Sequence, residues 1–274
     1  MRIEIRTVEP ESFFAGEWPD EVLAGDVAFC RRVEFAPRVF SRSVCLAPYI
    51  GGSDAPQGEI WAVHEAELET TFGSEENDMW RFNVSDRTLH SVYLCLPFDT
   101  VLGPDDAIGR WTAVSRVEGL PRLDRPSSFC MAEPKYRCVS SDGQTLLAVT
   151  EAGRHEVVSD RWRLSISDDI DLLFAGARYC GWMITRPAAY LVADRVKHLP
   201  GPQDVDSVVV DIFRRYLLLV DEDAMDAIED GDPGVVARLR TLRDELGDVA
   251  DDGGPRDALR EELESLLRWA NHIT

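Results

Sequence analysis

Lysine is nearly absent from this sequence: Lys135 and Lys197 are the only two, against 27 arginines. Basic residues are also few overall, because Asp and Glu total 50 while Lys and Arg total 29, which gives a net charge of −21. A protein with this excess of negative charge repels the phosphates of nucleic acids. Arg31-Arg32 and Arg214-Arg215 are isolated pairs. We therefore expect no direct binding of nucleic acid through a basic face.

Long apolar runs are missing as well, and none approaches the ~20 residues that a membrane span needs. The first six residues, 1–6, alternate apolar and charged side chains, whereas a secretory signal has a continuous apolar core. The cysteines are widely spaced and mostly lie in apolar runs, which favours buried, reduced thiols over disulfides: Cys30, Cys45, Cys95, Cys130, Cys138 and Cys180. We expect a cytoplasmic protein without a membrane anchor.

The sequence contains no Walker-type loop, no Gly-x-Gly-x-x-Gly, no Cys-x-x-Cys, no His-Glu-x-x-His and no Gly-x-Ser-x-Gly. These absences argue against nucleotide binding, a structural or catalytic zinc site, and a serine hydrolase. The segment from Gly51 to Asp54 is the nearest approach to a glycine-rich loop, and we interpret it as an ordinary turn. We favour a protein that is not an enzyme.

Residues 1–199 predict an antiparallel, β-rich body, because short apolar or alternating segments are separated by Gly, Pro and Asp. Residues 89–96 read as a buried strand and residues 111–117 as a half-buried strand. A hairpin is predicted in which residues 136–139 pair with residues 145–149 across Asp142-Gly143, a dipeptide that tolerates the positive φ angles of tight turns.

A second hairpin is predicted to run from residues 170–174, through Ala175-Gly176-Ala177, into residues 178–184. Between the hairpins, side chains alternate along a further strand. One face carries Trp162, Leu164 and Ile166, and the other carries Arg161, Arg163 and Ser165.

The segment from Leu199 to Asp204 ends the β pattern, because two prolines and a glycine interrupt any regular element. Residues 205–274 then predict two to four amphipathic helices, either packed on the body as one domain or forming a separate unit. One helix follows Asp232-Pro233, an N-cap with a proline in the first turn, and another begins near Pro255. The predicted fold class is α+β.

Negative charge is concentrated in the helical part, where residues 221–274 hold 16 acidic and 6 basic side chains. Such a surface favours encounter with a basic partner. We predict partner contacts at acidic residues flanking the helices and at one tryptophan: Asp221, Glu222, Asp223, Asp251, Asp252 and Trp182. The structural alternatives are a helix cap for Asp221 to Asp223 and a core position for Trp182.

The strongest enzyme-like pattern is His64-Glu65-Ala66-Glu67-Leu68-Glu69. On a strand Glu65, Glu67 and Glu69 share one face, where a divalent cation would relieve their repulsion and His64 would lie close by. A solvated acidic face with a core histidine is the structural alternative. We interpret the group Asp168-Asp169-x-Asp171 as turn residues.

Cys180 is the other candidate for catalysis, as a nucleophile with His155 or His198 as its base. A buried strand cysteine explains it better. The sequence thus favours a cytoplasmic, non-enzymatic binding protein, an inhibitor, immunity-type protein or adaptor, that docks a basic protein and needs no cofactor. A hydrolase using a divalent metal at the glutamate cluster is the first alternative. A structural subunit that assembles through its helices, as a homo-oligomer or in a larger complex, is the second.

Overall fold

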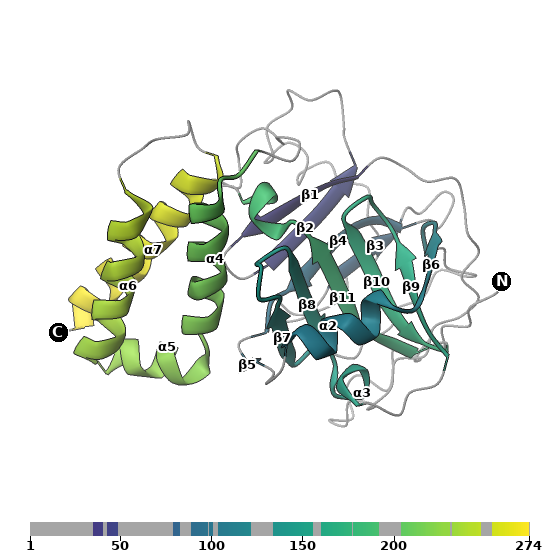
Figure 1. Cartoon of the computed structure of the whole chain (residues 1–274), viewed down its shortest axis with the longest axis horizontal. Coiled ribbons are helices and arrows are strands. Elements are labelled where there is room, and N and C mark those ends of the chain that lie inside the picture. The colour runs from purple at the N-terminus through teal and green to yellow at the C-terminus, as the bar shows by residue number, and fades with distance from the viewer. Residues whose placement is uncertain are drawn as a thin grey trace.

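The computed structural model shows two β-sheets beside a group of C-terminal helices (Figure 1). It describes residues 35–40, 43–48, 79–82, 89–97, 99–100, 104–121, 134–155, 160–176, 178–191, 204–230, 232–247 and 254–273. The protein is α+β, as predicted. Among these residues, no helix combines the length and the apolar character that crossing a membrane requires.

The larger sheet has seven strands in the order β5-β7-β8-β11-β10-β9-β6. Their bounds are β5 Asp99–Thr100, β6 Ser115–Glu118, β7 Tyr136–Val139, β8 Thr145–Val149, β9 Arg161–Ser165, β10 Ile170–Ala175 and β11 Arg178–Thr185. The inner pairs are antiparallel, but β5 pairs with β7 and β6 pairs with β9 in parallel. The prediction of an antiparallel body was therefore wrong at both edges. Neither edge strand is joined to its neighbour by a hairpin, so neither connection imposes an antiparallel direction.

The smaller sheet has four antiparallel strands in the order β1-β2-β4-β3. Their bounds are β1 Phe35–Phe40, β2 Ser43–Pro48, β3 Met79–Phe82 and β4 Leu89–Cys95. The strand predicted at residues 89–96 is thus confirmed as β4. Alternate side chains along it lie in one buried cluster, since Val92, Leu94 and then Leu96, just after the strand, are each at most 6 % exposed.

The seven-stranded sheet is covered on both faces. Along β8, Leu146 and Ala148 join the core shared with the smaller sheet, while Leu147 and Val149 join a second cluster beneath α2 (Pro104–Thr112). The short helix α3 (Glu151–Arg154) packs on the same outer face, beside β11. Figure 1 shows α2 lying across this sheet, with the smaller sheet behind it.

Both predicted hairpins are present, as β7–β8 and β10–β11. The first turn is longer than the tight turn we expected, since five residues, 140–144, separate the strands. Gly143 has a φ of 71°, and the Asp142 carboxylate accepts hydrogen bonds from Ser140 Oγ and the Gln144 N–H. The side chain of Asp142 therefore closes a wider loop.

The strand predicted at residues 111–117 was wrong in its first half. Trp111 belongs to α2, where it is buried with Ala107 and Ile108, and β6 begins only at Ser115. The spacing of these three apolar residues, i, i+1 and i+4, is helical. Pro104 and the acidic Asp105 fit the first turn of a helix, so the sequence carried a helix signal that the strand interpretation overlooked.

The C-terminal helices are α4 (Ser207–Leu219), α5 (Glu222–Glu229), α6 (Pro233–Leu246) and α7 (Pro255–Ile273). Aspartate side chains cap the first three: Asp206 for α4, Asp221 for α5 and Asp232 for α6. The predicted helix start at Asp232-Pro233 is thereby confirmed. The predicted apolar stripe of α4 included Val208, which is 45 % exposed. The other apolar side chains of these helices are largely buried, at Val209, Ile212, Phe213, Tyr216, Leu217, Val235, Val236, Leu239, Leu242, Leu246, Leu259, Leu263, Leu266 and Leu267.

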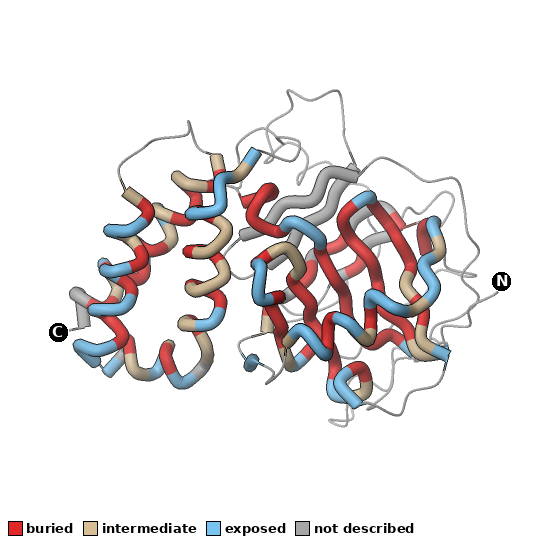
Figure 2. Tube along the Cα trace, in the orientation of Figure 1, coloured by how far each residue is buried: buried red, intermediate tan, exposed pale blue. Residues whose placement is uncertain are grey.

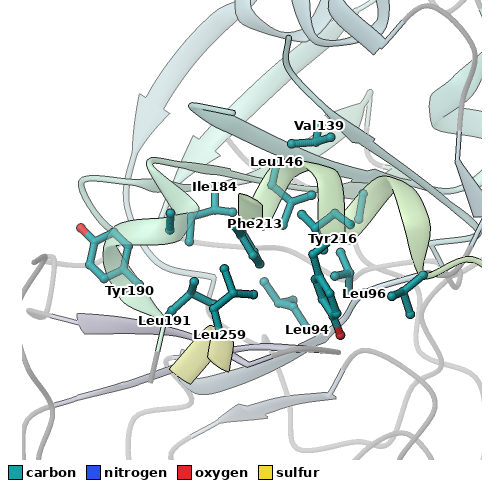
Figure 3. Packing of buried hydrophobic residues seen from close by; sticks show 14 of the residues in the cluster. Leu94, Leu96, Val139, Leu146, Ile184, Tyr190, Leu191, Phe213, Tyr216 and Leu259 are labelled. Carbon is teal, nitrogen blue, oxygen red and sulfur yellow. The ribbon is translucent and has the colours of Figure 1, made fainter. Parts of the chain in front are cut away.

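These stripes belong to the same core as the sheets. Phe213 and Tyr216 of α4 lie among Leu94, Leu146 and Ile184 (Figure 3). A 3-10 helix, η2 (Pro187–Tyr190), also contacts α4, α7 and β1. The stripes of α6 and α7 are thus buried inside the chain, so a role in assembly would have to use another surface of these helices.

Candidate functional site: the acidic helix α5

α5 is an amphipathic helix with an exposed carboxylate face. Ala224 and Ile228 are buried in the core, whereas Asp223, Asp226 and Asp230 are exposed. Buried and exposed stretches alternate in this way along the C-terminal helices in Figure 2. The three aspartates recur at i, i+3 and i+7, a spacing that places them along one side of a helix. α5 therefore presents a row of negative charge to solvent.

These three carboxylates have no basic partner in the part of the chain that the structure describes, and α5 itself contains no Lys or Arg. Many carboxylates on the neighbouring helices are different, because they pair with arginines. The pairs are Asp206–Arg256, Asp211–Arg214, Glu245–Arg215, Asp244–Arg243, Asp257–Arg260 and Glu264–Arg268. The negative charge of Asp223, Asp226 and Asp230 is thus left uncompensated among the described residues, whereas these neighbouring carboxylates are each matched by a cation.

The arrangement is locally unfavourable for the helix. Asp226 and Asp230 are like charges at i, i+4, which cost about 0.2–0.5 kcal/mol per pair in isolated helices. Asp230 is also the C-cap residue, where the partial negative charge of the helix end favours a cation instead. A local conflict without a structural compensation is a feature of functional positions.

An exposed leucine precedes α5 in the chain. Leu218, in the last turn of α4 and three residues before the Asp221 cap, is 44 % exposed. The cavity beside it, bordered by Leu217 and Arg137, measures about 10 Å³, which is the room that one water molecule needs. The surface here offers an apolar contact and negative charge, and this cavity is too small for a substrate.

The structure places the predicted partner residues in different surroundings. Asp221 accepts a hydrogen bond from the Ala224 N–H as the cap of α5, and Asp223 is exposed on the acidic row. Glu222 begins α5, while Asp251 and Asp252 lie outside the described residues. Trp182 is 0 % exposed within the core, the alternative position that we had considered for it. Sequence reasoning missed Asp226 and Asp230, although their spacing from Asp223 was a usable signal.

The carboxylate pattern predicted to bind a metal, formed by His64, Glu65, Glu67 and Glu69, also lies outside the described residues and stays a prediction. Within the described ranges, no three His, Cys, Asp or Glu side chains converge as a metal site would require.

The second acidic group, at residues 168–171, forms ion pairs rather than a plain turn. Asp171 is 4 % exposed and accepts from Arg163 Nη1 at 2.8 Å and Arg116 Nε at 3.0 Å. Asp169 accepts from Arg186 and from the Tyr190 hydroxyl, and burial followed by this hydrogen bond raises the pKa of Tyr190. Removing one partner from a buried ion pair is strongly destabilising, so these carboxylates serve the structure.

Cys180 is fully buried, and burial raises the pKa of its thiol to about 11. Burial likewise raises the pKa of the Cys138 thiol to about 12. Since the thiolate is the reactive form, burial disfavours the reactive form of both cysteines near neutral pH. His155 pairs with Glu151 at 3.1 Å, and His198 lies outside the described residues. The burial of Cys180 agrees with its interpretation as a core cysteine.

Comparison of the chain with family models, with curated proteins and with solved structures gave no match. The function therefore has to be inferred from the side chains themselves. Among the described residues, the acidic row of α5 is the feature whose chemistry most clearly points outward, to another molecule.

Proposed function

We propose that this protein is a non-enzymatic binding protein, acting as an inhibitor, immunity-type protein or adaptor, that docks a basic partner protein through α5 and Leu218. The observation that carries the proposal is the contrast between the unpaired Asp223, Asp226 and Asp230, which lie in one row, and the many carboxylates of α4, α6 and α7 that pair with arginines. Lysines and arginines of a partner would relieve repulsion that the chain leaves in place.

The two components of this surface would contribute differently. Exposed charges speed the encounter of complementary proteins and reject partners of like charge, so they act chiefly on the association rate and on its salt dependence. Leu218, in the last turn of α4, supplies apolar area, and an apolar residue of the partner that covers it would slow dissociation. A basic surface with one apolar projection is the complement that we expect.

A pull-down from the native host's lysate tests the proposal, with the purified full chain as bait at low and at high salt. A triple variant, Asp223→Asn with Asp226→Asn and Asp230→Asn, removes the acidic row. The matched control removes three exposed carboxylates outside α5: Asp106→Asn, Asp204→Asn and Glu261→Gln. We expect one basic protein that the wild type and the control retain at low salt and that the triple variant loses.

A protein captured equally by all three baits would contradict the proposed surface. Loss of binding in the control as well would show that net charge, and not α5, determines capture. The metal content of the bait is measured in the same preparation. A bait that returns alone with a stoichiometric divalent cation would replace this proposal by the hydrolase hypothesis at Glu65, Glu67 and Glu69.

A further inference from the structure

A group of arginines lies on the outer face of the seven-stranded sheet, where α2 and α3 cover it (Figure 1). Arg110 belongs to α2, Arg154 to α3, Arg161 to β9 and Arg178 to β11. We call these four residues the arginine surface. They come from four different elements, and they do not form a basic run in the sequence.

Aromatic rings hold two of these guanidinium groups. The Cζ atom of Arg154 lies 4.4 Å from the centroid of the Tyr136 ring, and that of Arg161 lies 5.0 Å from the centroid of the Trp111 ring. Trp111 is only 2 % exposed, so its ring is a fixed support. Stacking uses the flat face of a guanidinium and leaves its N–H edge for hydrogen bonds.

Arg161 still has donor capacity to spare. One Nη2 hydrogen bond reaches the main-chain oxygen of His155, while the buried Nε has no hydrogen-bond partner among the described residues. A buried donor without a partner is unfavourable, so an anion held against this guanidinium group would be favoured. Arg154 is exposed beside it on α3.

The strand register places Arg161 and Arg178 in one row across the sheet, because both pair with Ala175 of β10. Burial, and after it the charge of Arg110, lowers the pKa of Arg161. Arg110 and Arg154 both act on the Cys138 thiol, while Arg161 and Arg178 act on the Cys180 thiol, and both thiols belong to the cluster beneath α2.

Two carboxylates border the arginine surface. Glu151 accepts from the Tyr136 hydroxyl at 2.6 Å and pairs with His155, and the exposed Asp160 directly precedes Arg161. Glu151 also interacts with Arg154, because the hydrogen bond from Tyr136 and, with it, the charge of Arg154 lower the pKa of the Glu151 carboxyl. The gathering of four guanidinium groups stands out in a protein whose net charge is −21.

We propose that the arginine surface binds a phosphate group of a small phosphorylated ligand, a phosphate monoester or a pyrophosphate. Phosphate oxygens accept the paired N–H bonds that guanidinium groups offer, and a doubly charged anion relieves the repulsion among neighbouring arginines. A long polyanion is disfavoured because the remainder of this acidic protein repels it. A small ligand approaches the arginines without that penalty.

Calorimetric titration of the full chain with inorganic pyrophosphate tests this inference, at an ionic strength held constant with sodium chloride. We expect saturable binding near one equivalent, weakened at least tenfold by Arg161→Gln and by Arg154→Gln. Arg238→Gln on α6, an exposed arginine away from this face, should bind as the wild type does. Circular dichroism confirms that each variant is folded.

Binding that does not saturate, or that all three variants share equally, would overturn the proposal. Because Arg154 is exposed, its variant decides the matter even if Arg161→Gln fails to fold. Arg154→Lys keeps the charge but loses the planar fork, and we expect it to restore only part of the affinity. Single-stranded oligonucleotide is also tested as a competitor of pyrophosphate. Displacement at an oligonucleotide concentration, counted in phosphate groups, below that of the pyrophosphate would overturn the small-ligand assignment in favour of nucleic acid.

Discussion

Arg137 in β7 donates hydrogen bonds from Nη2 to the main-chain oxygen of Val220, where α4 ends, and to that of Leu217 one turn earlier. The arginine is 4 % exposed, and burial lowers its pKa to about 10, so it stays charged at neutral pH. A cation at this position complements the negative end of the helix and satisfies carbonyls that have no partner within it. The seven-stranded sheet thus holds α4 by its C-terminus.

Replacing Arg137 by Met should lower the free energy of unfolding by about 1.5–3 kcal/mol, because hydrogen bonds from a charged donor are lost and two buried carbonyls remain. Urea unfolding followed by circular dichroism measures the change. Arg238→Met, an exposed change on α6, is the control and should stay within about 0.5 kcal/mol of the wild type. An equal effect of both variants would show that Arg137 does not anchor α4.

Local patterns in the sequence predicted much of this fold, whereas contacts between residues distant in the chain could not be predicted. The Asp232-Pro233 helix start and the two hairpins follow from neighbouring residues, and the structure contains them. The Arg137 contact joins residues 80 and 83 positions apart, and no local signal identifies it. The parallel edges of the larger sheet were missed for the same reason, because they also pair strands that are distant in the chain.

The candidate site divides in the same way. Asp221 and Asp223 were predicted because acidic residues at a helix start are recognisable from the sequence alone. Which carboxylates of the acidic helices would find arginine partners depends on tertiary contacts such as Arg215 with Glu245, 30 residues apart. The unpaired state of Asp226 and Asp230 therefore emerged only from the structure.

Gly153 in α3 touches β11 so closely that a Cβ atom there would lie 2.4 Å from the Cys180 main-chain oxygen. Gly153→Ala should push α3 from the sheet and cost about 1–3 kcal/mol of stability, the usual range for overpacking. Gly109→Ala is the opposite case, because a Cβ atom at Gly109 in α2 meets nothing within 4 Å.

That second substitution should stabilise the protein by about 0.5–1 kcal/mol, since Ala is the better helix former. Thermal unfolding of both variants measures the two shifts, which should differ in sign. Destabilisation by Gly109→Ala, or none by Gly153→Ala, would contradict the packing described here.

Asp206 links the start of α4 to α7. Its carboxylate accepts from the N–H groups of Val208 and Val209 and pairs with Arg256, and the hydrogen bond from Val209, followed by those contacts, lowers its pKa. A folded-state pKa below the unfolded one contributes stability that is present above roughly pH 4 and is lost as the pH falls through the folded value.

Asp206→Ala should therefore lower the free energy of unfolding by about 0.5–2 kcal/mol at pH 7, the usual contribution of an N-cap residue. The loss should be smaller in acid, at pH values below the folded-state pKa of Asp206. Urea unfolding at a series of pH values from neutral to strongly acidic follows this dependence. Asp204→Ala, at an exposed position outside the cap, should show no such trend. A cost for Asp206→Ala that stays constant with pH would rule out the charged contacts as its source.

Asp230, at the end of α5, and Asp232, at the start of α6, should respond in opposite directions when each is replaced by a positively charged residue. Asp230, the C-cap of α5, lies where a cation is favoured, so Asp230→Lys should raise the free energy of unfolding by about 0.3–1 kcal/mol. Asp232 caps α6 by accepting from the N–H groups of Gly234 and Val235, so Asp232→Lys should lower it by about 0.5–2 kcal/mol.

Guanidinium chloride titration at moderate salt separates the two effects, and partner capture by the same proteins completes the argument. If α5 is a docking surface, Asp230→Lys gives a more stable protein that captures less partner, because the charge that binding requires is the one that the helix disfavours. A variant that gains stability and keeps full capture would place the docking surface elsewhere, whereas a loss of stability would show that Asp230 has a structural contact of its own.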